Sequence, residues 1–236
     1  MRQWHVRGSS AALPVTSCLN LQKLYPTAPS GVYWLKPAGV ASPFLNYCDM
    51  TFNGGGWTLV MKIDGGASTF DYNSSYWTST TGYGSGADLD LTQTKFASYW
   101  TVGFTQIQFA MRSGTAYNAI VGTKSASSLR AIMAGGKLAS VGGLSYGSWQ
   151  SLIPGSCVQN NCKAQGFNMD FNVQTSVRIG IMGNNESDCA TPDSFIGFGG
   201  DAGDCGYGGI ASGNATCTSS PCGDKNTPTW GFIFVR

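Results

Sequence analysis

The densest group of potential metal ligands in the sequence lies between Gly183 and Tyr207. From Ile179 to Asp224 the chain has six carboxylates and no Lys or Arg, although the whole molecule has a formal charge of +2. Carboxylate, amide and carbonyl oxygens are the hard ligands that Ca²⁺ prefers. Glycines in the segment would let backbone carbonyls turn inward at low steric cost. The candidate ligands are Asn184, Asn185, Glu186, Asp188, Asp193, Asp201 and Asp204.

A calcium-binding loop is the leading interpretation of this segment, so Ca²⁺ is the expected cofactor. The first choices as ligands are Asn185, Glu186, Asp193 and Asp201. The second choices, which adjoin cysteines, are Asp188 and Asp204. The alternative is a solvated acidic loop pinned by a disulfide, and the spacing does not match the EF-hand pattern.

Three aromatic residues are candidates for stacking on a sugar ring: Phe198, Tyr207 and Trp230. The alternative for each is a place in the hydrophobic core, and for Trp230 the core is favoured. The only histidine is His5, so a Ser-His-Asp or Cys-His site is excluded from the rest of the chain. Paired carboxylates would hydrolyse glycosides only if an apolar pocket kept one protonated, whereas a cation keeps them ionised. We therefore expect no enzyme activity.

Eight cysteines indicate disulfides: Cys18, Cys48, Cys157, Cys162, Cys189, Cys205, Cys217 and Cys222. Zinc ligation, the alternative, would favour cysteine pairs with histidines. Connectivity does not follow from sequence alone, but pairing of neighbours gives 18–48, 157–162, 189–205 and 217–222. Because disulfides persist in oxidising compartments, we expect a secreted, extracellular protein.

Composition limits the remaining classes. With 236 residues, 42% of them hydrophobic, the chain can bury a sizeable core. No segment approaches 18 apolar residues, so no membrane span is predicted. The sequence has no run of Lys or Arg that would attract nucleic acid. Residues 1–16 lack the apolar core of a signal peptide, and they predict a disordered tag or linker outside the fold.

We expect an α+β fold with a twisted, mainly antiparallel sheet, and the apolar patterns predict its short helices, strands and long loops. Short helices are predicted over residues 17–25, 92–98 and 127–133. Strands are predicted over residues 31–36, 44–52, 54–62, 105–112, 117–122, 167–171, 175–182 and 230–236. The last of these is apolar on both faces, which is typical of a central strand. Residues 142–155 and 183–207 are predicted to be loops.

The run YCDMTFNGGGWTLVMK, residues 47–62, resembles the signature that opens fibrinogen-like C-terminal domains. The residues in place are Cys48, Asp49, Met50, Gly54, Gly55, Gly56, Trp57 and Thr58. In that family the cysteine of C-D-M pairs with one about 30 residues earlier, which implies a bond between Cys48 and Cys18. The acidic end of the chain also resembles intelectins, a lectin branch that shares the opening motif.

The resemblance implies a single fibrinogen-like domain over residues 17–236. It divides into a disulfide-stapled subdomain over residues 17–63 and a central sheet with calcium and ligand loops over residues 64–236. The implied function is calcium-dependent binding of a glycan or acetylated ligand outside the cell, as in lectins of innate immunity. The alternative is a protein-binding or cell-adhesion module in which calcium is only structural, and homo-oligomers are compatible with either.

The chain departs from both family patterns near Cys189. The D-x-D calcium motif is absent, and residues 184–188, NNESD, stand in its place. The G-G-W-W segment that lines the acetyl pocket is replaced by GGDA after Phe198. The sugar-site histidine of intelectins has no counterpart. Calcium binding is therefore better supported by the resemblance than any one ligand is.

Overall fold

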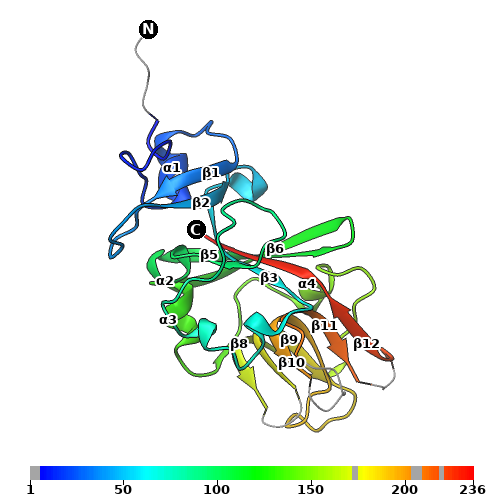
Figure 1. Ribbon diagram of the computed structural model, residues 1–236. Helices are drawn as coiled ribbons and strands as arrows, with labels where there is room; N and C mark the ends of the chain where they lie inside the picture. The colour runs from blue at the N-terminus through cyan, green and yellow to red at the C-terminus, as the bar shows by residue number, and fades with distance from the viewer. Residues whose placement is uncertain (1–5, 172–174, 203–208, 218–220) are drawn as a thin grey trace.

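The computed structural model describes residues 6–171, 175–202, 209–217 and 221–236. Within them the chain forms two antiparallel sheets with short helices, so the predicted α+β class is confirmed. In Figure 1 the first strands and α1 lie at one end of the molecule, and the sheet that contains β8 to β12 lies at the other. The rest of the first sheet, with the C-terminal strand, runs between them.

The first sheet has seven strands in the order β1-β2-β3-β13-β5-β6, with β4 paired to β3. Their bounds are β1 Gly31–Leu35, β2 Phe44–Asp49, β3 Trp57–Asp64, β4 Thr94–Lys95, β5 Phe104–Ser113, β6 Ala116–Ala126 and β13 Trp230–Val235. Strand β13 lies between β3 and β5, and the residues after Trp230 are buried. The prediction of a central last strand is therefore confirmed.

The second sheet has six strands in the order β12-β11-β10-β9-β8-β7. Their bounds are β7 Leu138–Ala139, β8 Asn161–Asp170, β9 Ser176–Asn184, β10 Ser194–Asp201, β11 Ser212–Thr216 and β12 Lys225–Pro228. Its main core contacts are with the first sheet, where Phe198 of β10 lies 5.6 Å from the ring of Phe109. Trp149 stacks on Phe109 at 5.2 Å.

The prediction of a loop over residues 183–207 is wrong for β10, which is a buried strand. Its glycines allow close packing rather than a turn. Gly197 pairs with Gly180 across β9 and β10, and a Cβ on Gly197 would lie 2.8 Å from the Cα of Gly180. A Cβ on Gly200 would overlap the ring of Phe195. Glycine in a strand often marks such a close approach of backbone or side chains.

The helices are short, and serine side chains cap three of them. Their bounds are α1 Cys18–Leu24, α2 Ser98–Thr101, α3 Leu129–Met133 and α4 Tyr146–Gln150, with 3₁₀ turns η1 Phe52–Gly54, η2 Ser68–Phe70 and η3 Ser75–Trp77. Ser17, Ser128 and Ser145 each accept a hydrogen bond from a backbone N–H in the first turn of α1, α3 and α4. Helix α4 lies within residues 142–155, where the sequence predicts a loop. The capping box of Ser145 and Ser148 is the signal that identifies it.

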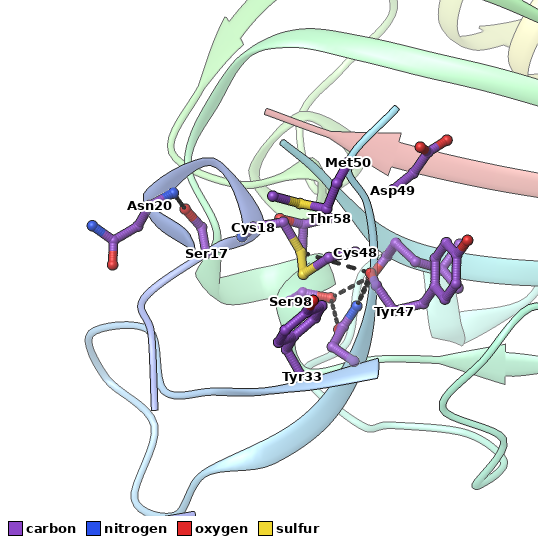
Figure 2. The surroundings of a disulfide bond; sticks show 12 residues. Ser17, Cys18, Asn20, Tyr33, Tyr47, Cys48, Asp49, Met50, Thr58 and Ser98 are labelled. Carbon is purple, nitrogen blue, oxygen red and sulfur yellow. Dashed lines mark hydrogen bonds between the residues drawn. A yellow bond between two sulfur atoms is a disulfide. The ribbon is translucent and has the colours of Figure 1, made fainter. Parts of the chain in front are cut away.

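The N-terminal part of the fold is organised around a buried disulfide between Cys18 and Cys48, as predicted. Both cysteines are fully buried, and the backbone N–H of Cys18 donates to Thr58 Oγ1 at 3.1 Å. Figure 2 shows this bond beside Ser98, whose hydroxyl donates to Asn46 Oδ1 at 2.9 Å. Helix α1, β2 and β3 are thus tied to one buried polar network.

Residues 6–16, which the sequence predicts to be a disordered tag or linker, lie against β1. The backbone N–H of Trp34 donates to the carbonyl of Gly8 at 2.8 Å. Val15 forms a parallel bridge with Leu35 and is only 2% exposed. This segment therefore continues the edge of the first sheet. Among the described residues, no helix is long and apolar enough to cross a membrane.

Candidate ligand-binding site

Most of the predicted calcium ligands lie on the turn between β9 and β10. Asn185, Glu186 and Asp188 are exposed there. The turn is closed by a hydrogen bond of 3.0 Å from the N–H of Asp193 to the carbonyl of Gly183. A disulfide between Cys162 and Cys189 fastens the turn to β8. The sequence therefore locates an exposed acidic turn correctly, and we call residues 185–193 the acidic turn.

Two of the predicted ligands shape the acidic turn through their own hydrogen bonds. Asn184 is fully buried; its Nδ2 donates to the carbonyl of Asp188 at 2.6 Å, and its Oδ1 accepts from the N–H of Asn185 at 2.7 Å. Asp188 Oδ1 accepts from the N–H of Ala190 at 3.0 Å, and Oδ2 accepts from Thr191 Oγ1 at 3.1 Å. These contacts are sufficient to explain why an amide and a carboxylate stand at these positions.

The predicted ligand set is divided between the two ends of β10. Asp193 precedes this strand, whereas Asp201 ends it and pairs with Ser176. Eight residues of extended chain span about 25 Å, so one ion does not contact both carboxylates. Asp204 and Tyr207 lie outside the described residues. Within the described ranges, no three His, Cys, Asp or Glu side chains gather closely enough to hold a metal ion.

The three neighbour pairings of the later cysteines are wrong. Cys162 bonds to Cys189 and Cys157 bonds to Cys222. Cys217 is also disulfide-bonded, and Cys205 lies outside the described residues. The reason is strand pairing: Cys162 follows Asn161, which faces Asn184 across β8 and β9, so Cys162 reaches the acidic turn. Sequence distance is a poor guide once strands pair across a sheet.

The aromatic candidates differ in their access to a ligand. Phe198 is fully buried between the sheets, so stacking on a sugar is excluded by its packing. Trp230 is only partly buried and begins β13 at the surface. It lines a pocket of about 240 Å³ together with Asp64, Arg112 and Thr229. We call this the Trp230 pocket.

The register of the first sheet creates the Trp230 pocket. Trp230 pairs with Asp64 of β3 on one side and with Arg112 of β5 on the other. The indole ring thus starts from a strand flanked by a carboxylate and a guanidinium. Asp64 Oδ1 accepts from the N–H of Gly66 at 3.0 Å, and Arg112 Nε donates to the carbonyl of Gly114 at 3.3 Å.

Asp64 and Arg112 do not form an ion pair with each other. The only ion pair in the part of the chain that the structure describes joins Lys62 to Asp90. The Trp230 pocket therefore offers an aromatic surface, a hydrogen-bond acceptor and a planar donor group to a ligand. Sequence reasoning missed Asp64 and Arg112, because only the order of β3, β13 and β5 brings them beside Trp230.

The run ADLDL, residues 87–91, contains two aspartates, and the positive charge beside them is that of Lys62. Lys62 is fully buried; its ammonium donates to the carbonyl of Asp88 at 3.0 Å and to Asp90 Oδ1. The hydrogen bond from Lys62 lowers the pKa of Asp90 below its ordinary value of 3.8. This contact anchors the loop before β4 to β3.

Comparison with known proteins addresses the first half of the chain. Residues 18–124 match the family of the fibrinogen beta and gamma chains, C-terminal globular domain. Residues 18–124 are fibrinogen-related. This fibrinogen-related region contains α1, β1 to β6 and the Cys18–Cys48 bond.

Two individual proteins show the extent of the similarity. Angiopoietin-4 of Bos taurus is 38% identical over 56 residues, which cover 24% of this chain and 11% of that protein. The fibrinogen-like globe domain of human ANGPTL2 is 19% identical, with a TM-score of 0.32, and the match covers 46% of this chain and 49% of that chain. The chain thus spans a small part of the curated relative's length. The fibrinogen-related region supports an extracellular recognition module.

Proposed function

We propose that this chain is an extracellular recognition domain that binds carbohydrate and catalyses no reaction. The Trp230 pocket carries the proposal, because Trp230 lines it from a strand position between Asp64 and Arg112. Aromatic rings pack against the C–H groups of a sugar, while a few placed polar groups orient its hydroxyls. The described disulfides, with no free cysteine among the described residues, support an oxidising compartment.

The charged groups of the pocket suggest which ligands fit. A carboxylate only accepts hydrogen bonds, so Asp64 suits sugar hydroxyls. A guanidinium only donates, so Arg112 suits a ring oxygen, a hydroxyl oxygen or the carbonyl of an acetyl group. The Trp230 pocket is small, with a volume of about 240 Å³. We therefore propose a single neutral or N-acetylated sugar residue as the unit that is recognised.

We also propose that Ca²⁺ binds at the acidic turn and has a structural role. Support comes from three exposed residues with oxygen-bearing side chains, Asn185, Glu186 and Asp188, in a stretch of chain without Lys or Arg. The N–H of Cys217, just after β11, donates to the carbonyl of Asp193 in this turn. The other end of β11, at Gly213, pairs with Pro228 beside the Trp230 pocket. Because β11 separates the two places, the ion would not touch a sugar at Trp230.

A glycan array probed with and without calcium tests the proposal. We expect retention of neutral or N-acetylated sugars by the native chain, and loss of at least tenfold in affinity in Arg112→Gln. Trp230→Val, which keeps strand propensity, should lose binding further. Arg7→Gln is the matched control, since Arg7 is exposed in the N-terminal segment. An array that stays blank, or equal binding by Arg7→Gln and Arg112→Gln, would reject a sugar site at Trp230.

A protein-binding module is the second candidate, and one surface favours it. The apolar side chains of Val32 on β1 and Leu45 on β2 are each 40% exposed on one face of the first sheet. Val32 and Trp34 lie on one face of β1, where Trp34 pairs with Leu45. An exposed sheet face with apolar side chains suits a protein partner. Loss of partner binding in Val32→Ser with Leu45→Ser, while Arg112→Gln binds normally, would support this candidate over the sugar site.

A further inference from the structure

A second pocket lies at the opposite end of the β5–β6 hairpin from Trp230. Ser113 pairs with Ala116 at the turn beside Trp230, whereas Phe104 pairs with Ala126 at the far end. The far pocket has a volume of about 430 Å³. The residues that line it include Lys124, Ser125, Ser127, Ile132, Gly136 and Lys137. We call it the lysine pocket.

The charge of the lysine pocket has one sign. Two lysines line it, and no carboxylate does so among the described residues. The ammonium of Lys137 lies 3.4 Å from the centre of the Phe171 ring. Such a cation–π contact limits the positions of an exposed lysine, so less order is lost when an anion binds. Lys124 is half-buried on β6.

One wall of the lysine pocket is held in place by a buried amide. Asn168 is 6% exposed, and its Nδ2 lies within hydrogen-bonding distance of four carbonyls: Gly135 at 3.1 Å, Ile132 and Met133 at 3.2 Å, and Gly136 at 3.4 Å. Asn168 Oδ1 accepts from Arg178 at 2.9 Å. The segment between α3 and β7 is therefore fixed before any ligand arrives.

This fixed wall also orients backbone donors. In a trans peptide the N–H points opposite to the carbonyl of the preceding residue. Since the carbonyls of Gly135 and Gly136 face Asn168, the N–H groups of Gly136 and Lys137 point away from it. In the described part of the chain, neither N–H donates to a protein acceptor. Successive free N–H groups near lysines are a common arrangement for oxyanions.

We propose that the lysine pocket binds a small ligand that carries a carboxylate or sulfate group, such as an acidic sugar. The two ammonium groups and the N–H groups of the fixed wall would hold the oxyanion. Ile132 and the serines would contact the uncharged part of the ligand. This proposal does not rest on the Trp230 pocket, because the two pockets lie at opposite ends of the hairpin. Either can therefore fail alone.

Amide chemical shifts of the isotope-labelled full chain test the proposal with three probes: glucuronate, galactose 6-sulfate and galactose. We expect saturable shifts at Gly136 and Lys137 with one or both anionic probes and none with galactose. Binding of only one anion would identify carboxylate or sulfate as the group that is recognised. No saturable shift with either anion, or an equal response to galactose, would overturn the proposal.

Three variants distinguish binding in the lysine pocket from a general effect of positive charge. Lys124→Gln with Lys137→Gln should weaken binding of the anionic probe at least tenfold. Lys23→Gln with Lys36→Gln removes the same charge from exposed positions in the N-terminal region and should leave binding unchanged. Gly136→Leu should fold, because a Cβ there meets nothing within 4 Å, and its side chain should block the pocket. Equal weakening by both lysine pairs, or normal binding by Gly136→Leu, would contradict the assignment.

Discussion

The Cys18–Cys48 disulfide of the N-terminal region and the Cys162–Cys189 disulfide of the second sheet stabilise the fold in different ways. Cys18 and Cys48 are fully buried in a small cluster with Leu21 and Leu35. Cys189 is exposed and Cys162 half-buried, and their bond fastens a surface turn to β8. The first bond therefore replaces part of a core that α1 and two strands are too small to provide. The second only restrains an exposed turn of the six-stranded second sheet.

Removal of each disulfide gives the sharpest test of this difference. The bonds close similar separations of 30 and 27 residues, so loop entropy alone gives about 3.5 kcal/mol for each. Cys18→Ala with Cys48→Ala also leaves a buried cavity, and we expect a total loss of about 5 kcal/mol. Cys162→Ala with Cys189→Ala should lose about 3.5 kcal/mol or less. Urea unfolding of both variants measures the two losses.

Selective reduction is the control for this pair of variants. Mild reductant should open the exposed Cys162–Cys189 bond before the buried Cys18–Cys48 bond, because a thiolate must reach the sulfur it attacks. Alkylation and mass spectrometry would record the order. Equal free-energy losses together with simultaneous reduction would mean that burial does not distinguish the two bonds.

The two regions also contain a matched pair of buried asparagines. Asn46 Nδ2 donates to the carbonyl of Leu59 at 2.9 Å, and Asn214 Nδ2 donates to the carbonyls of Phe195 at 2.7 Å and Cys157 at 2.9 Å. Each side chain also accepts a hydrogen bond, Asn46 Oδ1 from Ser98 and Asn214 Oδ1 from the N–H of Cys157. Alanine at either position would remove these buried hydrogen bonds together, so we expect a loss of about 3 kcal/mol in each case. Thermal unfolding of Asn46→Ala and Asn214→Ala measures it. A loss below about 1 kcal/mol at Asn214 would show that the second sheet tolerates what the N-terminal region does not.

The burial of Asn214 is also an example of what the sequence alone does not predict. It opens an N-A-T glycosylation sequon, which suggests an exposed connection, yet it is fully buried in β11. The N-terminal region was predictable because its motif is contiguous: Cys48, the glycines and Trp57 lie within a few residues, and the strands they join are neighbours. In the second sheet the partners of each residue are set by strand order. Local patterns carry no information about that order.

The candidate site also has one part that was predictable from local sequence and another that depends on strand order. The acidic turn is a local feature of the sequence, and its exposure was predictable. Asp201 was assigned to the same loop because it lies in the same acidic, glycine-rich stretch of sequence. The glycines of β10 instead serve close packing against β9 and Phe195. The Trp230 pocket joins Asp64, Arg112 and Trp230, which are separated by up to 166 residues. Its composition required the order β3-β13-β5, which no local pattern specifies.

The ion pair between the buried Lys62 and the more exposed Asp90 provides a smaller and pH-dependent test within the first sheet. Asp90→Asn would leave the buried Lys62 ammonium without its carboxylate, and we expect a loss of about 2 kcal/mol at pH 7, since Asp90 is itself partly exposed. The pKa of Asp90 is lowered in the folded chain, so this stability is present above pH 3.8 and is lost as the pH falls through the lowered value. Asp88→Asn is the control, because Lys62 contacts only the carbonyl of Asp88. The difference between native and Asp90→Asn chains should therefore shrink below pH 3.8, and a constant difference would exclude the ion pair as its cause.

Calcium should have the smallest effect, and it should be confined to the second sheet. Extracellular calcium modules often have Kd values near 10⁻⁴ M, so 1 mM Ca²⁺ would add about 1.4 kcal/mol, or about 4 °C in Tm. Glu186→Ala should abolish this gain, whereas Asp88→Ala, also exposed but on the loop before β4 of the first sheet, should keep it. Hydrogen exchange should slow at residues 184–194 and stay unchanged around Cys18 and Cys48. Identical melting curves in calcium and EDTA would remove the ion from the proposed function, and protection spread over both regions would mean that the acidic turn is coupled to the N-terminal core.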